Sequence, residues 1–287
     1  MTPPFTEHVE ILFSAFGFVA AMTVFAWGLG FFRLPQKEAE SQVSIWSTLG
    51  VFAVYFFVQL LFVPVIVSTY LYMTQGKLPE NLGSVLTRAD VGWISFVSIL
   101  SSTIAVLIYS VFFGRPVWNP GNNSCLQKIK AFVIGALSWF FVYPWVVVIG
   151  QLVIIAFIVY TQEVPPNIDQ AMVKHIKEIS SNLPLYWATI MSVIFIVPIA
   201  EELLFRGFLQ NAFKKNFGLF SSIVITSVLF AFLHYSPSQG VANWQIVLSL
   251  FVVSCFLGYL YERQKTLWAP IALHIAINGI SIAILFL

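Results

Sequence analysis

Long apolar runs without a charged side chain restrict what this chain can fold into. Before residue 185, four such runs exceed 18 residues, the length at which an apolar stretch becomes a candidate transmembrane helix. They span 11–32, 43–72, 91–114 and 131–161. Charged residues make up only 9% of the 287, whereas soluble domains contain about 25%. We therefore expect an all-α, polytopic membrane protein.

The rest of the chain adds four further apolar segments, at 185–213, 219–234, 244–261 and 268–287. Together the segments predict about eight transmembrane helices that form one bundle around an intramembrane polar site. The runs 43–72 and 131–161 exceed a single span and contain Pro64 and Pro144, so tilt or a kink is expected there.

The hydrophilic connections are short, so we expect one membrane domain with two functional parts. Helices within 1–184 carry no acidic or basic side chain in their interiors and are assigned as scaffold and as the wall along which substrate enters. Residues 185–287 are assigned as the catalytic core of the same domain.

Three ionisable side chains lie close together in the fifth segment, where they are costly to keep. If the stretch is helical, Glu202 and Arg206 share a face and can pair, while Glu201 points about 100° away. The alternative reading is a charge cluster that marks the membrane-proximal end of a helix.

Two further polar clusters follow in apolar segments. Phe230 and His234 end one segment, and His274 and Asn278 lie one helical turn apart in the last. A lone histidine in such a helix is more often a packing or hydrogen-bonding residue than a catalyst. The Pro- and Gly-broken stretch 235–240 follows His234 and is expected to line the site.

The positions of these groups along their helices predict that they meet. Lys214, Lys215 and Gly218 predict a helix end and a turn. Glu201 precedes Gly218 by 17 residues and His234 follows it by 16. Both would lie roughly 20 to 25 Å from the turn, so they can face each other.

The three motifs Glu-Glu-x-x-x-Arg, Phe-x-x-x-His and His-x-x-x-Asn resemble those of the CAAX prenyl protease type II and bacteriocin-processing (CPBP) family of intramembrane proteases. The resemblance covers roughly residues 185–287, with the motifs in the family's order. It implies a catalytic set of Glu201, Glu202, Arg206, Phe230, His234, His274 and Asn278.

Peptide hydrolysis inside a membrane needs a water, a base and donors for the developing oxyanion. Glu201 is the expected base, and His234 shares the water with it. His274 and Asn278 would supply the donors, and Glu202 with Arg206 would support the site.

A metal site is the alternative to this arrangement, with zinc held by Glu201, His234 and His274. We favour no cofactor, because the zincin pair His-Glu-x-x-His is absent.

Other classes of membrane protein fit the sequence less well. Rhomboid-type proteases need a Gly-x-Ser-Gly serine, and the chain contains no such tetrapeptide. Aspartyl intramembrane proteases need two intramembrane aspartates, whereas the only aspartates here, Asp90 and Asp169, lie at a helix edge and in a loop. A net charge of +2 gives no indication of nucleic-acid binding. Expected partners are the lipid bilayer and a membrane-embedded or lipidated substrate, either prenylated CAAX-type or bacteriocin-like. A non-catalytic immunity or scaffold protein is the second reading, and a transporter is the third.

Charge in the connections predicts the orientation, because Lys and Arg favour the cytoplasmic side. The odd-numbered connections hold Arg33, Lys37, Arg115, Lys128, Lys130, Arg206, Lys214, Lys215, Arg263 and Lys265, and the even-numbered ones hold Lys77, Arg88, Lys174 and Lys177. The turns at Gly218 and Gln264 should therefore face the cytoplasm. The expected localisation is an integral, multi-pass membrane protein, in the cytoplasmic membrane if the source is prokaryotic.

Overall fold

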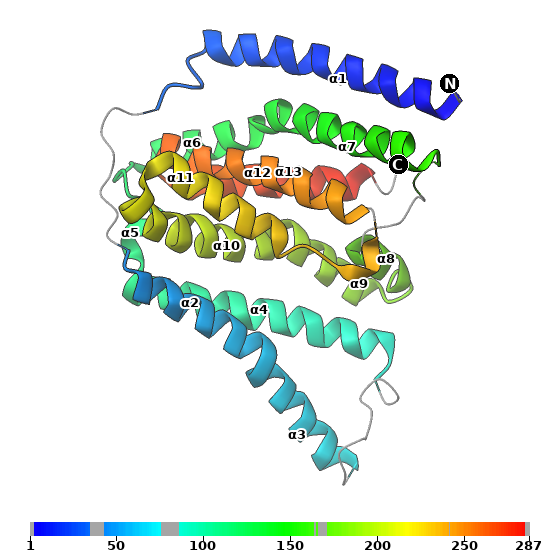
Figure 1. Ribbon diagram of the computed structural model, residues 1–287. Coiled ribbons are helices and arrows are strands. Elements are labelled where there is room, and N and C mark those ends of the chain that lie inside the picture. The colour runs from blue at the N-terminus through cyan, green and yellow to red at the C-terminus, as the bar shows by residue number, and fades with distance from the viewer. Residues whose placement is uncertain are drawn as a thin grey trace. The chain divides into compact units, whose positions relative to one another are not determined.

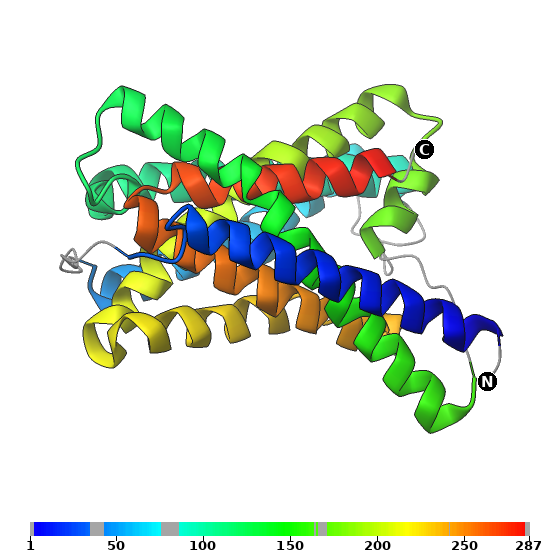
Figure 2. The same cartoon turned by 90° about the horizontal axis from the view of Figure 1, so that it is seen from above.

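The computed structural model describes residues 3–34, 43–75, 86–163, 165, 171–240 and 242–284. Within these ranges every regular element is a helix and no strand occurs (Figure 1). Figure 2 shows the same helices from above. Lys37, Lys77 and Asp169 lie outside the described ranges. The all-α prediction is confirmed.

Six of the described helical stretches are long and apolar enough to cross a membrane. They are Phe5–Gly28, Ile45–Thr74, Arg88–Phe113, Cys125–Thr161, Leu183–Phe232 and Ala242–Gln264, and a shorter apolar helix, α13, spans Trp268–Ile284. The protein is an integral, multi-pass membrane protein, as predicted.

Gly218 interrupts the longest of these stretches. Its φ of 77° and ψ of 174° form a backbone conformation that glycine adopts readily and other residues avoid. Helix α11 (Asn211–Phe232) therefore breaks where the sequence predicts a turn. Leu183–Phe232 thus contains two of the predicted helices, while the number of eight membrane crossings stays a prediction.

The run that contains Pro64 is irregular next to the proline. It passes from α2 (Ile45–Phe57) through the π-helical turn η1 (Val58–Phe62) into α3 (Val63–Gln75). Pro64 has no N–H, so the carbonyl four residues earlier loses its α-helical partner within that turn. By contrast, α7 (Trp139–Thr161) continues through Pro144. The break in that run lies at Ser138, directly after α6 (Cys125–Leu137).

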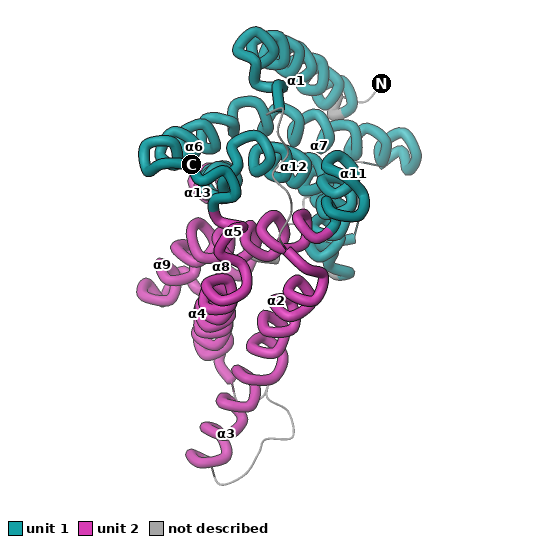
Figure 3. Tube along the Cα trace, turned by 90° about the vertical axis from the view of Figure 1, so that its left-hand side faces the viewer, with its two compact units in different colours: residues 1–41, 119–169, 213–277 teal, residues 42–118, 170–212, 278–287 magenta. Residues whose placement is uncertain are grey.

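The described helices form two compact units (Figure 3). Unit 1 comprises residues 1–41, 119–169 and 213–277, and unit 2 comprises residues 42–118, 170–212 and 278–287. Helices α11 and α13 therefore contribute to both units. The functional division between residues 184 and 185 stays a prediction.

In unit 1, α1 (Pro3–Gly28) and α12 (Ala242–Gln264) both pack along α7. The core between them is apolar and includes Ala26, Val142, Leu257, Leu260 and Leu273. Helices α6 and α13 also cross closely in this unit. A Cβ added to Gly135 of α6 would lie only 2.1 Å from the Ala269 carbonyl oxygen of α13, so the crossing needs a glycine at this position.

One end of unit 1 gathers connections that are far apart in sequence. Arg263 Nη2, near the end of α12, donates to the Gly30 carbonyl oxygen at 3.2 Å. The Gly121 N–H, before α6, donates to the Lys265 carbonyl oxygen at 3.2 Å. The connections after α1, before α6 and after α12 therefore lie together.

In unit 2, α2 packs against α4 (Arg88–Phe113) and against the π-helical segment η4 (Leu203–Gln210). The short helix α5 (Arg115–Trp118) covers the same segment. A Cβ at Gly114 would lie 2.4 Å from the Phe208 ring, so this glycine lets α4 end directly against η4. Helix α8 (Ala171–Glu178) also belongs to this unit.

Candidate active site

One nearly continuous helical rod carries Glu201, Glu202 and Arg206. It starts with α9 (Leu183–Met191), where the Asn182 side chain accepts from the Leu185 N–H and caps the first turn. The rod continues as the π-helical turn η3 (Ser192–Ile196), α10 (Val197–Glu202) and η4. The predicted helix is confirmed, although its hydrogen bonding is of π type on both sides of the two acids. Such π segments often occur at functional sites.

Pro198 explains the first π segment and the position of Asn278. The Val197 N–H reaches back to the Ser192 carbonyl, and Pro198 has no N–H to offer. Neither Val197 nor Pro198 therefore donates a backbone hydrogen bond to the Val193 carbonyl. The Asn278 Nδ2 donates to that oxygen at 2.8 Å, so the side-chain amide replaces the missing backbone donor. Asn278 thus ties the end of α13 to the helix that carries Glu201.

The two adjacent acids lie in different environments. Glu202 is fully buried and pairs with the fully buried Arg206, with 3.0 Å between Oε1 and Nη1. The predicted pairing is confirmed. Removing one partner of such a buried pair typically costs about 3 to 5 kcal/mol, because the other charge is left in the interior. Glu201, in contrast, is only half-buried.

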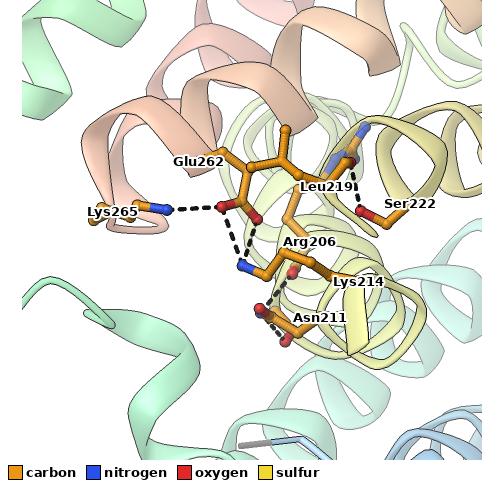
Figure 4. Close-up of polar contacts among 8 residues, drawn as sticks. Arg206, Asn211, Lys214, Leu219, Ser222, Glu262 and Lys265 are labelled. Atoms are coloured by element: carbon orange, nitrogen blue, oxygen red, sulfur yellow. Dashed lines mark hydrogen bonds and ion pairs between the residues drawn. The ribbon is translucent and has the colours of Figure 1, made fainter. Parts of the chain in front are cut away.

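Asn211 supports the same segment from its C-terminal end. Its Nδ2 donates to the carbonyl oxygens of Arg206 at 3.1 Å and Gly207 at 2.8 Å (Figure 4). Sequence reasoning missed this residue, although an amide shortly after an Arg-Gly pair in an apolar helix is a polar group that needs partners.

His234 is held at the end of α11 by its own helix. The His234 N–H bonds to the Ala231 carbonyl, so the Phe230 carbonyl loses its α-helical donor. The His234 ring replaces it, with Nδ1 2.8 Å from that oxygen. Since a carbonyl only accepts, Nδ1 carries a proton, and Nε2 of the neutral ring is the acceptor nitrogen.

The Phe230 ring contacts both candidate histidines of unit 1, His234 and His274. Its centroid lies 4.7 Å from that of His234 and 6.2 Å from that of His274, the latter in an edge-on arrangement. Phe230 and His274 are buried, and His234 is half-buried. Two motifs that are 40 residues apart in sequence, His234 and His274, thus meet at one aromatic ring.

The loop after His234 is held by one amide. The buried Asn243 accepts from the Ser236 N–H at 2.9 Å and donates to the Gly240 carbonyl at 3.3 Å. It thereby closes the loop around the short 3₁₀ helix η5 (Pro237–Gln239). The expectation that this loop lines the site stays a prediction.

The seven candidate residues divide between the two units. Unit 2 contains Glu201, Glu202, Arg206 and Asn278, and unit 1 contains Phe230, His234 and His274. Among the described residues of either unit, no group of three His, Cys, Asp or Glu side chains forms a metal-binding cluster. The zinc set combines Glu201 with the two histidines, and its role stays a prediction.

A second buried charge cluster joins two turns of unit 1 (Figure 4). Lys214 Nζ lies 2.8 Å from Glu262 Oε1, and Lys265 Nζ lies 2.9 Å from Glu262 Oε2. Sequence reasoning treated these residues as separate turn signals. The cluster holds the turn at Gly218 beside the turn after α12, so both turns lie at the same end of their helices.

Residues 183–280 match the family model described as type II CAAX prenyl endopeptidase, Rce1-like. This segment is similar to an Rce1-like domain. The Rce1-like domain begins at the first residue of α9 and contains all seven candidate residues. The match to this family model confirms the resemblance drawn from the motifs. The matched family is one of type II CAAX prenyl endopeptidases.

The chain is also similar to a protein of Bacillus subtilis (strain 168) that is named uncharacterized protein YpbD. The two proteins are 30% identical over 91 residues, which make up 32% of this chain and 42% of YpbD. The chain therefore spans less than half the length of this curated relative. No solved structure matches the chain.

Proposed function

We propose that the protein is an intramembrane endopeptidase that hydrolyses a peptide bond of a membrane-associated substrate with a water activated by Glu201. The observation that carries the proposal is the contrast between the two adjacent acids of the Rce1-like domain. The carboxylate of Glu202 is buried and paired with Arg206, whereas Glu201 is half-buried on the same helix. A base must reach both water and substrate, and the partial exposure of Glu201 supports its assignment to this role.

In this proposal Glu201 takes a proton from the water as the water oxygen attacks the scissile carbonyl carbon. His234 holds the same water through Nε2, the acceptor nitrogen left by its bond to Phe230. The carbonyl oxygen gains the negative charge of the tetrahedral intermediate. The C–N bond then breaks, and the proton on Glu201 passes to the leaving amine.

Donors for the oxyanion come from His274 and Asn278. Asn278 has two amide hydrogens, and its bond to Val193 uses one of them. That bond fixes the orientation of the amide and leaves the second hydrogen to donate to substrate. Preorganised donors of this kind contribute most when their position is fixed before the reaction.

The proposed substrate is a membrane-embedded or lipidated peptide, either a prenylated CAAX-type carboxyl terminus or a bacteriocin-like peptide. The support is that every catalytic candidate lies on an apolar helix or directly at its end. We propose a reaction without a metal, with zinc bound by Glu201, His234 and His274 as the alternative.

The test compares wild-type protein with Glu201→Gln in liposomes. Peptides that share one scissile sequence are offered in prenylated, unprenylated and transmembrane forms, and new termini are detected by mass spectrometry. Glu201→Gln keeps the shape of the side chain and should lower turnover by about 10²- to 10⁴-fold, the usual contribution of a general base. The matched control is Glu163→Gln, an exposed glutamate after α7 that should retain full activity.

Membrane proteomes from cells with wild-type protein or Glu201→Ala would identify the natural substrate through a peptide terminus that depends on Glu201. A folded wild-type protein that cleaves none of the peptides and changes no terminus would contradict the protease and support the scaffold reading.

A further inference from the structure

A polar network crosses unit 2 in helices that precede the Rce1-like domain. Gln59, in η1, accepts from the Ser98 hydroxyl at 2.5 Å and donates through Nε2 to the Ser102 hydroxyl at 3.0 Å. Both serines belong to α4 and are buried. An amide inside an apolar bundle is costly without partners, so these bonds fix the position of the Gln59 side chain.

Tyr55 lies one helical turn before Gln59 and extends this network. Its hydroxyl has Gln59 as a side-chain hydrogen-bonding partner, and the negative charge of Glu201 acts on it. Tyr55 is half-buried, as Glu201 is. The network thus leads from α4 through Gln59 of η1 to Tyr55 of α2.

Two contacts give the register of α2 against the helix that carries Glu201. The Thr48 hydroxyl oxygen lies 3.4 Å from the Phe208 carbonyl oxygen. One turn later, the rings of Phe52 and Phe205 pack edge-on with centroids 5.7 Å apart. Residue numbers rise along one helix and fall along the other, so the two helices run antiparallel. One turn beyond the Phe52–Phe205 contact, Tyr55 of α2 reaches the level of Glu201 on the facing helix.

The hydrogen-bonding capacity of Gln59 indicates where the Tyr55 proton goes. The Gln59 carbonyl oxygen accepts from Ser98, and one amide hydrogen serves Ser102. The second amide hydrogen is then available to the Tyr55 oxygen. A tyrosine oxygen that accepts from Gln59 keeps its own proton for another acceptor. Glu201, at the same level of the facing helix, is the acidic side chain that influences this hydroxyl electrostatically.

We propose that Tyr55 is a positioning residue for Glu201. Its hydroxyl donates to the Glu201 carboxylate and holds it in the orientation in which it takes the proton from water. This inference rests on the proposed function. It gives the helices before residue 183 a part in the chemistry in addition to that of a scaffold.

The test is Tyr55→Phe, which removes one oxygen and leaves the bonds of Gln59 to Ser98 and Ser102 in place. Misplacement of a catalytic group by about 1 Å can cost about 100-fold in rate. We expect Tyr55→Phe to lower kcat by about 10- to 100-fold with an unchanged KM and an unchanged melting temperature. The matched control is Tyr70→Phe in α3, where the tyrosine is 65% exposed and no effect is expected.

The alternative is that the network only holds α2 and α4 together. In that case Tyr55→Phe would keep the wild-type kcat, or would lose kcat only in proportion to a loss of folded protein, and either result would overturn the inference. If Tyr55→Phe does not accumulate in membranes, Ser102→Ala carries the test. It removes the acceptor that orients Gln59 and should lower kcat a few-fold at constant KM, whereas an unchanged kcat would overturn the inference.

These outcomes are separable from failure of the proposed function. A wild-type protein without activity contradicts the protease itself. An active wild-type protein that needs Glu201 but tolerates Tyr55→Phe contradicts only the positioning role.

Discussion

The Asn278 side chain donates to the Val193 carbonyl, which Pro198 leaves without a backbone donor. This bond gives Asn278 a structural task in addition to the proposed donation to the oxyanion. The two tasks make different demands, since the first needs any donor to Val193 and the second needs the amide itself.

A pair of variants separates these tasks. Asn278→Ala should lower turnover by about 100- to 1000-fold, the typical loss for an oxyanion donor. It should also destabilise the protein by about 1 kcal/mol through the lost hydrogen bond. Adding Pro198→Ala supplies a backbone N–H near Val193 and should restore the melting temperature but not the turnover. Recovery of full turnover in the double variant would show that Asn278 acts only on the helix.

Glu202→Gln should destabilise the protein far more than Glu201→Gln. The change leaves the Arg206 guanidinium charged and fully buried, at an expected cost of about 3 to 5 kcal/mol. Glu201 is half-buried, so its change to Gln should leave the melting temperature almost unchanged. Thermal unfolding in detergent, followed by tryptophan fluorescence, compares the two. Equal melting temperatures would contradict the structural role of the Glu202–Arg206 pair.

The turns at Gly218 and Gln264 should both face the cytoplasm. The Lys214–Glu262 pair places them at one end of unit 1, and the excess of Lys and Arg in the odd-numbered connections selects the side. In a Cys125→Ser background, Asn216→Cys should react with an impermeant maleimide only after the membrane is opened. The native Cys125 is exposed at the start of α6 and should behave in the same way. Labelling of either cysteine in intact cells would reverse the orientation.

Removal of metal should leave the rate unchanged. In the proposed reaction Glu201 and His234 activate the water directly, so protein treated with a chelator should keep its kcat. If zinc were held by Glu201, His234 and His274, chelation would remove nearly all activity and added zinc would restore it. Metal content by mass spectrometry, measured with activity during dialysis, checks this. Zinc at one atom per chain that is lost in parallel with activity would contradict the prediction.

The sequence determined the parts of the protein that depend on local chemistry. Uninterrupted apolar runs have to become helices inside a bilayer, because every backbone group there must be bonded within its own segment. A glycine after Lys214 and Lys215 had to end a helix, and the structure breaks at Gly218. Spacing of four residues predicted the Glu202–Arg206 pair, which forms even though the π segment begins between them. The three motifs and their order indicated the resemblance to the CAAX prenyl protease type II family.

Tertiary structure decided which polar groups act on one another across the chain. Nothing in the local sequence links Asn278 to Val193, because that bond exists only where α13 packs against the carbonyl that Pro198 exposes. Lys214 and Glu262 each look like ordinary turn residues, yet they form a buried pair. Sequence reasoning did not single out Gln59 in its apolar run, and its partners Ser98 and Ser102 lie about 40 residues away on another helix. Local sequence shows that a buried polar group needs a partner, and only the packing of helices determines which partner it meets.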